Sequence, residues 1–377
     1  EVRNIKIAKI YGIEIKLHFS TLLIIGLVGF YSINFYLSII PNAPLIELIF
    51  VGLLNGIILL ISVLIHELSH SIVAQRYGLR VTEIELYLFG GVSKIEEEPR
   101  TPKSEMIISI VGPLSSFLIG VGLLSLLFLP INLPLIISVT LMYSGISNIV
   151  LSVFNLLPAF PIDGGRILRA FLWKRKNDIL SATKIASKVG LFIGYGLIFY
   201  GFFQSFVFSL FSGIWLIMMG IFLNSSTRQS YIQTKNEVIL SKVNIKKMLT
   251  ISNLEIPFSI PLDLAFIEYF IRYRKSYFPV IKGEDIIGII HIDDITRIPV
   301  LQRPNYIVGD IMRNVSDFPS IDDNKSGKEA LKNLRLMGNI PHIIAVKNKD
   351  TQELIGFLGE EELISFLNFW NLKTHNS

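Results

Sequence analysis

Residues 48–70 read LIFVGLLNGIILLISVLIHELSH, and this stretch decides the class of fold. From Leu48 to Ile65 the run is apolar apart from Asn55, Ser62 and two glycines. A helix needs roughly 20 such residues to cross the hydrocarbon core of a bilayer. The stretch therefore predicts a membrane-spanning helix that ends in a cluster of ionisable side chains.

The rest of the chain predicts a membrane domain followed by a soluble one. Of the 377 residues, 51% are hydrophobic and only 17% are charged, which is too apolar for an ordinary soluble protein. Long apolar blocks stop near residue 224, and the sequence is charged and mixed from about residue 230. We expect a membrane all-α domain over residues 1–228, with about six transmembrane helices and a small β-hairpin. A soluble α/β domain follows it.

The apolar blocks alternate with connections of different charge. The six blocks are about 18–40, 46–76, 105–129, 133–158, 186–203 and 205–224. Lys and Arg gather before the first block, between the second and third, and between the fourth and fifth, where they include Arg166 and Arg169. Because basic residues accumulate in cytoplasmic loops, six crossings with both termini cytoplasmic fit this pattern. For the last two blocks, which only Gln204 and a few small residues separate, one long broken segment is the alternative.

Charge and cysteine content narrow the possible partners. The net charge of +5 does not indicate nucleic acid, because the basic residues are spread over the connections and form no single face. The absence of cysteine excludes disulfides and thiolate metal ligands, and leaves His, Asp and Glu. Together with many Ile and Lys residues, it favours a prokaryotic cell membrane.

Within the second block, the apolar run is followed by His66-Glu67-Leu68-Ser69-His70, an H-E-x-x-H pattern. Helical residues four apart lie about 40° from each other around the axis, so both imidazoles can reach one Zn²⁺. Glu67 would lie beside the metal, where it can accept a proton from an attacking water. The alternative is a polar cluster that only marks the cytoplasmic end of the helix. A charged side chain at this depth costs about 2.5–3.5 kcal/mol, which metal coordination would offset.

Asp163 is the candidate for the third protein ligand that a hydrolytic zinc site requires. Residues 155–165 read NLLPAFPIDGG, and two prolines with two glycines prevent regular helix there. Irregular backbone at membrane depth is tolerated where it is packed in protein or lines a watery cavity. Asn155 can donate hydrogen bonds to a substrate backbone or to a developing oxyanion. For both residues the alternative is an ordinary helix end and turn.

Residues 83–98, EIELYLFGGVSKIEEE, predict a β-hairpin because two short alternating runs flank Gly90-Gly91. Its edge strand could pair with an unwound peptide, and a purely structural hairpin is the alternative.

The soluble part contains an internal repeat. Residues 276–295 and 339–363 share an apolar strand, a polar turn, an Ile-Gly strand and an acidic helix start. An amphipathic helix precedes each copy. We therefore expect two paired modules, over residues 238–300 and 301–370.

Three motifs resemble the site-2 protease family of intramembrane zinc metalloproteases. They are the H-E-x-x-H pattern, GPLSSF at 112–117, and residues 155–165. The resemblance implies that His66, His70 and Asp163 bind one Zn²⁺ ion. It also implies that Glu67 is the catalytic acid/base and that Asn155 contacts the substrate or the transition state. The same resemblance implies that the substrate is a transmembrane segment of another protein and that membrane lipid surrounds the enzyme.

The C-terminal repeat resembles a pair of cystathionine-β-synthase-type (CBS) domains, which in many proteins bind adenine nucleotides. There, a Gly-x-hydrophobic-Ser/Thr-x-x-Asp stretch holds the nucleotide. Here that stretch runs from Gly288 to Asp294 with His291 in place of the hydroxyl, and residues 356–362 lose both the hydroxyl and the Asp. The resemblance implies a regulatory or dimerisation module, with a homodimer as the expected assembly and Asp294 as the candidate nucleotide contact.

Two other classes of protein compete with an intramembrane protease. A channel or transporter with a regulatory CBS pair would explain the crossings, but it predicts polar residues along a pore and no compact H-E-x-x-H. A catalytically idle metal-binding scaffold would need no acid/base group. Glu67 argues against it.

Overall fold

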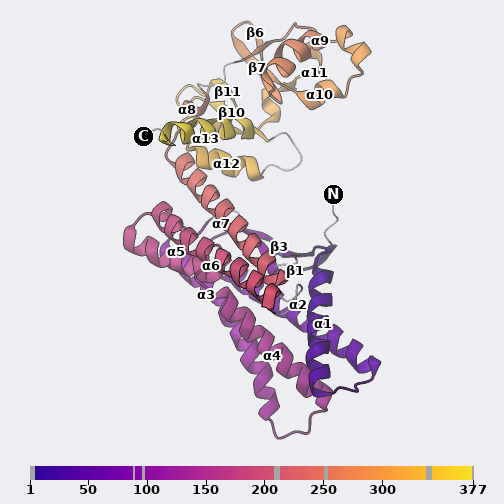
Figure 1. The fold of residues 1–377 in the computed structure, drawn as a ribbon. Helices are drawn as coiled ribbons and strands as arrows, with labels where there is room; N and C mark the ends of the chain where they lie inside the picture. The colour runs from indigo at the N-terminus through magenta and orange to yellow at the C-terminus, as the bar shows by residue number, and fades with distance from the viewer. Residues whose placement is uncertain are drawn as a thin grey trace. The chain divides into compact units, whose positions relative to one another are not determined.

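The computed structural model describes residues 5–87, 90–95, 98–207, 213–249, 254–336 and 342–375. The chain divides into two compact units, Glu1–Ile232 and Gln233–Ser377. Figure 1 shows that long helices dominate the first unit, whereas the second combines short helices with short strands. The boundary between the units falls within one helix, α7 (Ile214–Ser241).

The first unit is helical, as predicted. Its other helices are α1 (Thr21–Ile39), α2 (Leu45–Arg76), α3 (Pro102–Ser125), α4 (Leu135–Asn155), α5 (Asp163–Lys176) and α6 (Ile179–Val207). Within the described part of the chain, five helical stretches are long and apolar enough to cross a membrane. They are α1, α2, α3 with the short turn that extends it to Phe128, α4 and α6.

The division between the last two blocks lies later than Gln204, because α6 continues through this residue to Val207. The Gln204 amide donates a hydrogen bond to the Tyr200 hydroxyl, 3.2 Å away on the preceding turn, so the helix accommodates the polar side chain itself. Helices α6 and α7 approach closely, since a Cβ on Gly220 would lie 2.6 Å from the Gly194 carbonyl oxygen. Residues 208–212 between them lie outside the described residues. Because α7 is not among the five stretches, a sixth crossing stays a prediction.

A small sheet packs beside the helices. Its strands are β1 (Ile5–Ile10), β2 (Ile13–Leu17), β3 (Val81–Tyr87) and β4 (Gly90–Ile95), in that order. Strands β3 and β4 pair antiparallel, which confirms the predicted hairpin, although residues 88–89 at its turn are outside the described ranges. Strand β2 pairs with β3 in parallel, and β4 lies at the edge. The inner face of the sheet joins a core with α2 and α3 that includes Ile13, Ile84 and Ile108.

Small and polar residues mediate the contacts between the long helices. A Cβ on Gly120 of α3 would lie 2.8 Å from the Gly145 carbonyl oxygen of α4. One buried face of α4 carries a polar residue every four positions: Thr140, Ser144, Asn148 and Ser152. Such residues are typical of helix interfaces in membranes, where apolar side chains gain little by leaving lipid.

The second unit contains two sheets. The strands of the first sheet lie in the order β5 (Ile256–Pro257), β6 (Tyr277–Lys282), β7 (Asp285–His291) and β8 (Arg313–Asn314). The strands of the second sheet lie in the order β11 (Leu354–Gly359), β10 (Ile343–Lys347) and β9 (Ser320–Asp322). Each repeat forms a hairpin followed by a helix: β6, β7 and α10 (Ile292–Thr296), then β10, β11 and α13 (Glu360–His375). The preceding helices are α9 (Leu262–Ala265) with its continuation to Ile271, and α12 (Gly327–Leu336).

The hydrophobic cores of the second unit cross the predicted module boundary at residue 300. Val308 belongs to the core of the first repeat, whereas Ile239 and Ile245 pack with Ile344 of the second. A third cluster joins the two repeats and contains Tyr277 and Phe357. The two repeats therefore share core residues.

Candidate metal centre

Two imidazoles on α2 form the first part of the site. His66 and His70 lie one turn apart, and their exposed fractions are 4% and 8%. The spacing of four residues places both rings on one face of the helix. Their Nε2 atoms are 3.2 Å apart.

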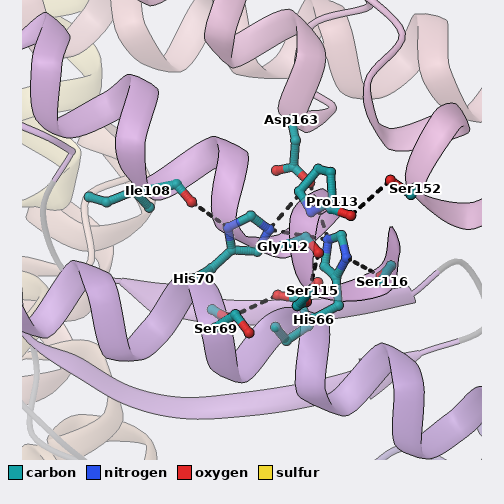
Figure 2. Close-up of polar contacts among 12 residues, drawn as sticks. His66, Ser69, His70, Ile108, Gly112, Pro113, Ser115, Ser116, Ser152 and Asp163 are labelled. Atoms are coloured by element: carbon teal, nitrogen blue, oxygen red, sulfur yellow. Dashed lines mark hydrogen bonds and ion pairs between the residues drawn. The ribbon is translucent and has the colours of Figure 1, made fainter. Parts of the chain in front are cut away.

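Asp163 joins the two histidines from a distant part of the chain. It is the first residue of α5, and its Oδ2 lies 3.2 Å from the Nε2 atom of each histidine (Figure 2). Gly164 and Gly165 permit this placement, because a Cβ on either would collide with the backbone of the loop before α5. The Asp-Gly-Gly sequence therefore sets the approach of the carboxylate.

Contacts to α3 orient both imidazoles. His70 Nδ1 lies 2.6 Å from the Ile108 carbonyl oxygen. Because a carbonyl oxygen can only accept a hydrogen bond, Nδ1 carries the proton, and the lone pair of Nε2 can bind a metal ion. His66 Nδ1 lies 2.9 Å from Ser116 Oγ, also on α3. Figure 2 shows both rings turned with Nε2 toward Asp163. Metal-binding histidines use such contacts to fix ring orientation and tautomer.

The donor set fits a zinc ion. His66, His70 and Asp163 offer two imidazole nitrogens and one carboxylate oxygen, all within 4.8 Å of one another. In a tetrahedral site with bonds of about 2.0–2.1 Å, neighbouring ligand atoms lie roughly 3.3 Å apart. The observed separations of 3.2 Å match that spacing. Three protein ligands would leave one position of a tetrahedral ion for water and substrate.

Glu67 lies on α2 between the two histidines and contacts the sheet. Ser93 of β4 donates a hydrogen bond to Glu67 Oε2 over 3.0 Å. Gly91 of the same strand lies against the Glu67 side chain, since a Cβ there would come within 2.9 Å of Glu67 Cδ.

Comparisons with known proteins agree on one family. The model of peptidase family M50 matches residues 56–136 and 132–201. Zinc metalloprotease MJ0392 of Methanocaldococcus jannaschii is 32% identical over 299 residues, which cover 78% of this chain and 80% of the relative. The chain belongs to peptidase family M50. It is a zinc metalloprotease of the site-2 type and an integral membrane protein.

Solved structures give two further similarities. The site-2 protease from Methanocaldococcus jannaschii is 36% identical and covers 60% of this chain and 94% of that chain, with a TM-score of 0.42. The CBS domain NE2398 is 18% identical and covers 33% of this chain and 97% of that chain, with a TM-score of 0.28.

Asn155 is the last residue of α4 in this M50 protease, and its side chain is half-buried. It is not part of the metal-binding group, which consists of His66, His70 and Asp163.

Sequence reasoning missed several residues that build the M50 site. Gly112 leaves room for the imidazoles, because a Cβ there would lie 2.7 Å from His66 Nε2 and 2.5 Å from His70 Cε1. The Pro113 carbonyl accepts a hydrogen bond from Ser152 Oγ over 2.8 Å, which ties α3 to α4 at the level of the site (Figure 2). The motif GPLSSF contains Gly112, Pro113 and Ser116, so the signal was present, but only the folded structure gives each residue its contact.

Arg169 of α5 has a different role from the one its place in a basic connection indicated. Its side chain is buried and forms an ion pair with Glu105 of α3, with Nε 2.6 Å from Oε1. Its Nη1 lies 3.4 Å from Glu98, just beyond β4, and its guanidinium stacks 4.8 Å from the Phe160 ring centroid. Arg169 thus holds α5, which carries Asp163, against α3 and the segment after β4.

Asp294, the candidate nucleotide contact, lies on α10 and is already paired. Arg313 of β8 binds it through both carboxylate oxygens, at 2.8 Å and 2.7 Å. His291, in the position of the expected hydroxyl, caps α10 by accepting a hydrogen bond from the Asp293 amide. This stretch therefore has internal partners for its polar groups.

Proposed function

We propose that this M50 protease hydrolyses peptide bonds within or near transmembrane segments of membrane-anchored substrates. The main support for this proposal is the metal-binding group of His66, His70 and Asp163, which lies at the end of the apolar run of α2. A site on a membrane-spanning helix meets a substrate that is also in the membrane. A spanning substrate helix must unwind locally, because helical hydrogen bonds occupy its carbonyl groups.

Different residues of the chain have different roles in the proposed hydrolysis. Zinc, when held by His66, His70 and Asp163, polarises the scissile carbonyl and acidifies a water molecule. Glu67 accepts a proton from the water as its oxygen bonds to the carbonyl carbon, and delivers that proton to the leaving nitrogen. The C–N bond breaks, and the products are a carboxylic acid and an amine, which become a carboxylate and an ammonium group when the acid proton passes to the amine. The Asn155 amide donates a hydrogen bond to the substrate backbone or to the oxyanion.

We propose that the unwound substrate binds to the edge strand β4. Its inner face contacts Glu67 through Gly91 and Ser93, while its outer edge has no neighbouring strand among the described residues. Pairing with a free strand edge is a common way to hold an extended peptide. A peptide added there lies next to the general base.

Zinc content and cleavage together test the proposal. We would measure bound zinc by mass spectrometry and cleavage of a single-span model substrate, in wild type, Glu67→Gln and Asp163→Ala. Glu67→Gln should keep its zinc and lose cleavage, and Asp163→Ala should lose both. The matched control is Glu14→Gln, an exposed carboxylate on β2 that pairs with Lys6. Undiminished cleavage by Glu67→Gln would refute the mechanism, and cleavage without zinc would refute the metal site.

We further propose that both termini and the second unit lie in the cytoplasm of a prokaryotic cell. The support is the alternation of basic and uncharged connections. Because the chain has no cysteine, single cysteines report orientation without background. In sealed right-side-out vesicles, Asn42→Cys should react with an impermeant maleimide, and Lys176→Cys and Lys349→Cys should not. The reverse labelling would contradict the orientation.

The second unit is proposed to be a CBS pair that regulates the protease or joins two copies of it, over approximately residues 238–370. Its α9 helix and the turns after it expose Leu264, Ile267 and Ile271, with exposed fractions of 46%, 54% and 56%. An apolar face of this kind favours a protein partner, and a second copy is the simplest one. In nanodiscs, Ile267→Glu should give single chains where the wild type gives dimers. Ile355→Glu, at another exposed position, is the control.

An adenine nucleotide at Asp294 is the less favoured ligand for this unit, because Arg313 already binds both carboxylate oxygens. Titration of AMP and ATP against the full chain tests it. Heat release that disappears in Asp294→Asn would support a nucleotide site there.

A further inference from the structure

Ser93 of β4 lies in a short chain of hydrogen bonds that ends on Glu67. Ser71 of α2 donates to Ser93 Oγ over 3.1 Å, and Ser93 donates to Glu67 Oε2 over 3.0 Å. Both donors point along one direction toward the carboxylate, so each bond polarises the next. Ser93 therefore bridges two residues that lie one turn apart on α2.

The alternation of β4 explains why Ser93 faces the base. Its neighbour Lys94 points to the opposite face of the sheet and pairs with Glu83 of β3. Two residues before Ser93, Gly91 faces inward and lies against the Glu67 side chain, with space for no Cβ. Two consecutive inward positions of β4 thus contact Glu67, one by close packing and one by a hydrogen bond.

We propose that Ser93 is a positioning residue for catalysis, and that β4 fixes the orientation of the general base as well as receiving the substrate. The inference rests on the proposed role of Glu67. A glutamate side chain has three rotatable bonds, so a base without a fixed partner would spend much of its time away from the water. With Oε2 held by Ser93, Oε1 is the oxygen that exchanges the proton.

The contacts of Ser93 distinguish positioning from metal binding. The hydroxyl bonds to Ser71 and Glu67 and to none of the three metal-binding side chains. Its removal should therefore leave zinc in place and slow the chemical step. If Ser93 only docked the hairpin, its removal would disturb the strand that holds the substrate, and KM would rise.

The experiment uses the full chain in nanodiscs with a single-span model substrate, and compares kcat, KM and zinc content. Ser93→Ala should lower kcat about tenfold, a part of the 10²–10⁴ that a positioned base contributes, with KM and zinc unchanged. Ser93→Thr keeps the hydroxyl and suits a strand, so it should restore kcat. Ser71→Ala should cause a smaller loss. Ser62→Ala is the matched control, since that buried hydroxyl of α2 donates to the Ile58 carbonyl of its own helix.

Each other outcome overturns the inference. An unchanged kcat in Ser93→Ala removes the positioning role, and a raised KM with normal kcat assigns Ser93 to docking alone. Loss in both Ser93→Ala and Ser93→Thr assigns the effect to strand packing. The same series includes Glu67→Gln, which separates the two proposals. If Glu67→Gln is inactive while Ser93→Ala is normal, the inference on Ser93 fails and the proposed base stands; if Glu67→Gln is active, the base itself is wrong.

Discussion

The two units use opposite kinds of residue at their internal contacts. In the membrane unit, close contacts are made by glycines and buried polar side chains, such as Gly112 beside the imidazoles and Ser144 beside Asn55. In the second unit, the cores consist mainly of buried Ile, Leu, Val and Phe, such as Ile344 and Phe278. Water drives apolar side chains together, whereas lipid does not, so the membrane helices depend on close approach and hydrogen bonds.

This difference predicts how each unit responds to change. In the membrane unit, one added methyl group at a close contact should be more damaging than the loss of a side chain facing lipid. In the second unit, lost volume in a core should matter more, with Leu or Ile to Ala costing about 2–5 kcal/mol.

Gly112→Ala should have the largest effect. The new Cβ would lie 2.7 Å from His66 Nε2, so the imidazoles must move from the metal position. Bound zinc and cleavage should both fall by about 100-fold, the upper end of the range for disturbed metal surroundings. Zinc analysis and cleavage of the model substrate measure this. Gly122→Ala is the control on the same helix, because it has no atom within 4 Å, and Gly356→Ala is the control in the second unit, with its nearest atom at 3.6 Å. Normal zinc in Gly112→Ala would contradict the geometry of the site.

Arg169→Met should have the next largest effect. It leaves Glu105, which is 1% exposed, as a buried carboxylate without its cation. Breaking a buried ion pair from one side costs about 3–5 kcal/mol, and here it also releases α5 with Asp163. We expect a lower unfolding temperature in detergent and weaker zinc binding. Lys174→Met, an exposed cation on the same helix, should change neither.

A double variant separates the charge effect from packing. Glu105→Gln combined with Arg169→Met should recover part of the lost stability, because it removes the buried unpaired charge of Glu105 and leaves only the partly exposed Glu98 without Arg169. If the double variant is as unstable as Arg169→Met, the shape of the arginine matters more than its charge.

Tyr277→Phe should have a smaller effect, confined to the second unit. Tyr277 donates a 2.5 Å hydrogen bond to Glu362, which connects the two repeats. Burial and the Glu362 carboxylate hold the pKa of Tyr277 well above its usual value, so the hydroxyl stays protonated. The variant should lose about 1–2 kcal/mol, since the Gly359 amide and Lys275 still bind Glu362. Hydrogen exchange of β6 and α13 in the full chain measures it, and faster exchange in α2 would contradict a local effect.

The metal-binding and catalytic residues could be predicted from the sequence more readily than the residues that pack around them. His66, Glu67 and His70 form a local pattern, and the loop before Asp163 is marked by prolines and glycines, so these residues could be proposed without coordinates. The hairpin of β3 and β4 was predictable for the same reason, because its strands are adjacent in sequence. Local spacing is what a single sequence records.

Apart from the approach of Asp163 to the two histidines, contacts between distant segments could not be predicted. Strands β1 and β2 alternate like the hairpin, but β2 gains its place by pairing in parallel with β3, more than sixty residues later. Ser93 and Arg169 look like ordinary surface residues until β4 and α5 pack on the site. Their roles depend on partners that lie far away in the chain.

Ser144→Ala should have the smallest effect and tests the comparison most directly. Ser144 Oγ donates to Asn55 Oδ1 over 2.6 Å and connects α4 to α2 inside the membrane unit. Hydrogen bonds between membrane helices contribute about 0.6 kcal/mol on average, because the separated helices also find partners. Asn55 keeps its bond to the Val51 carbonyl, so one buried acceptor alone loses its donor. Unfolding in detergent should show a loss of this size with zinc content unchanged. A loss above about 2 kcal/mol would mean that polar contacts, rather than close glycine packing, hold α2 and α4 together.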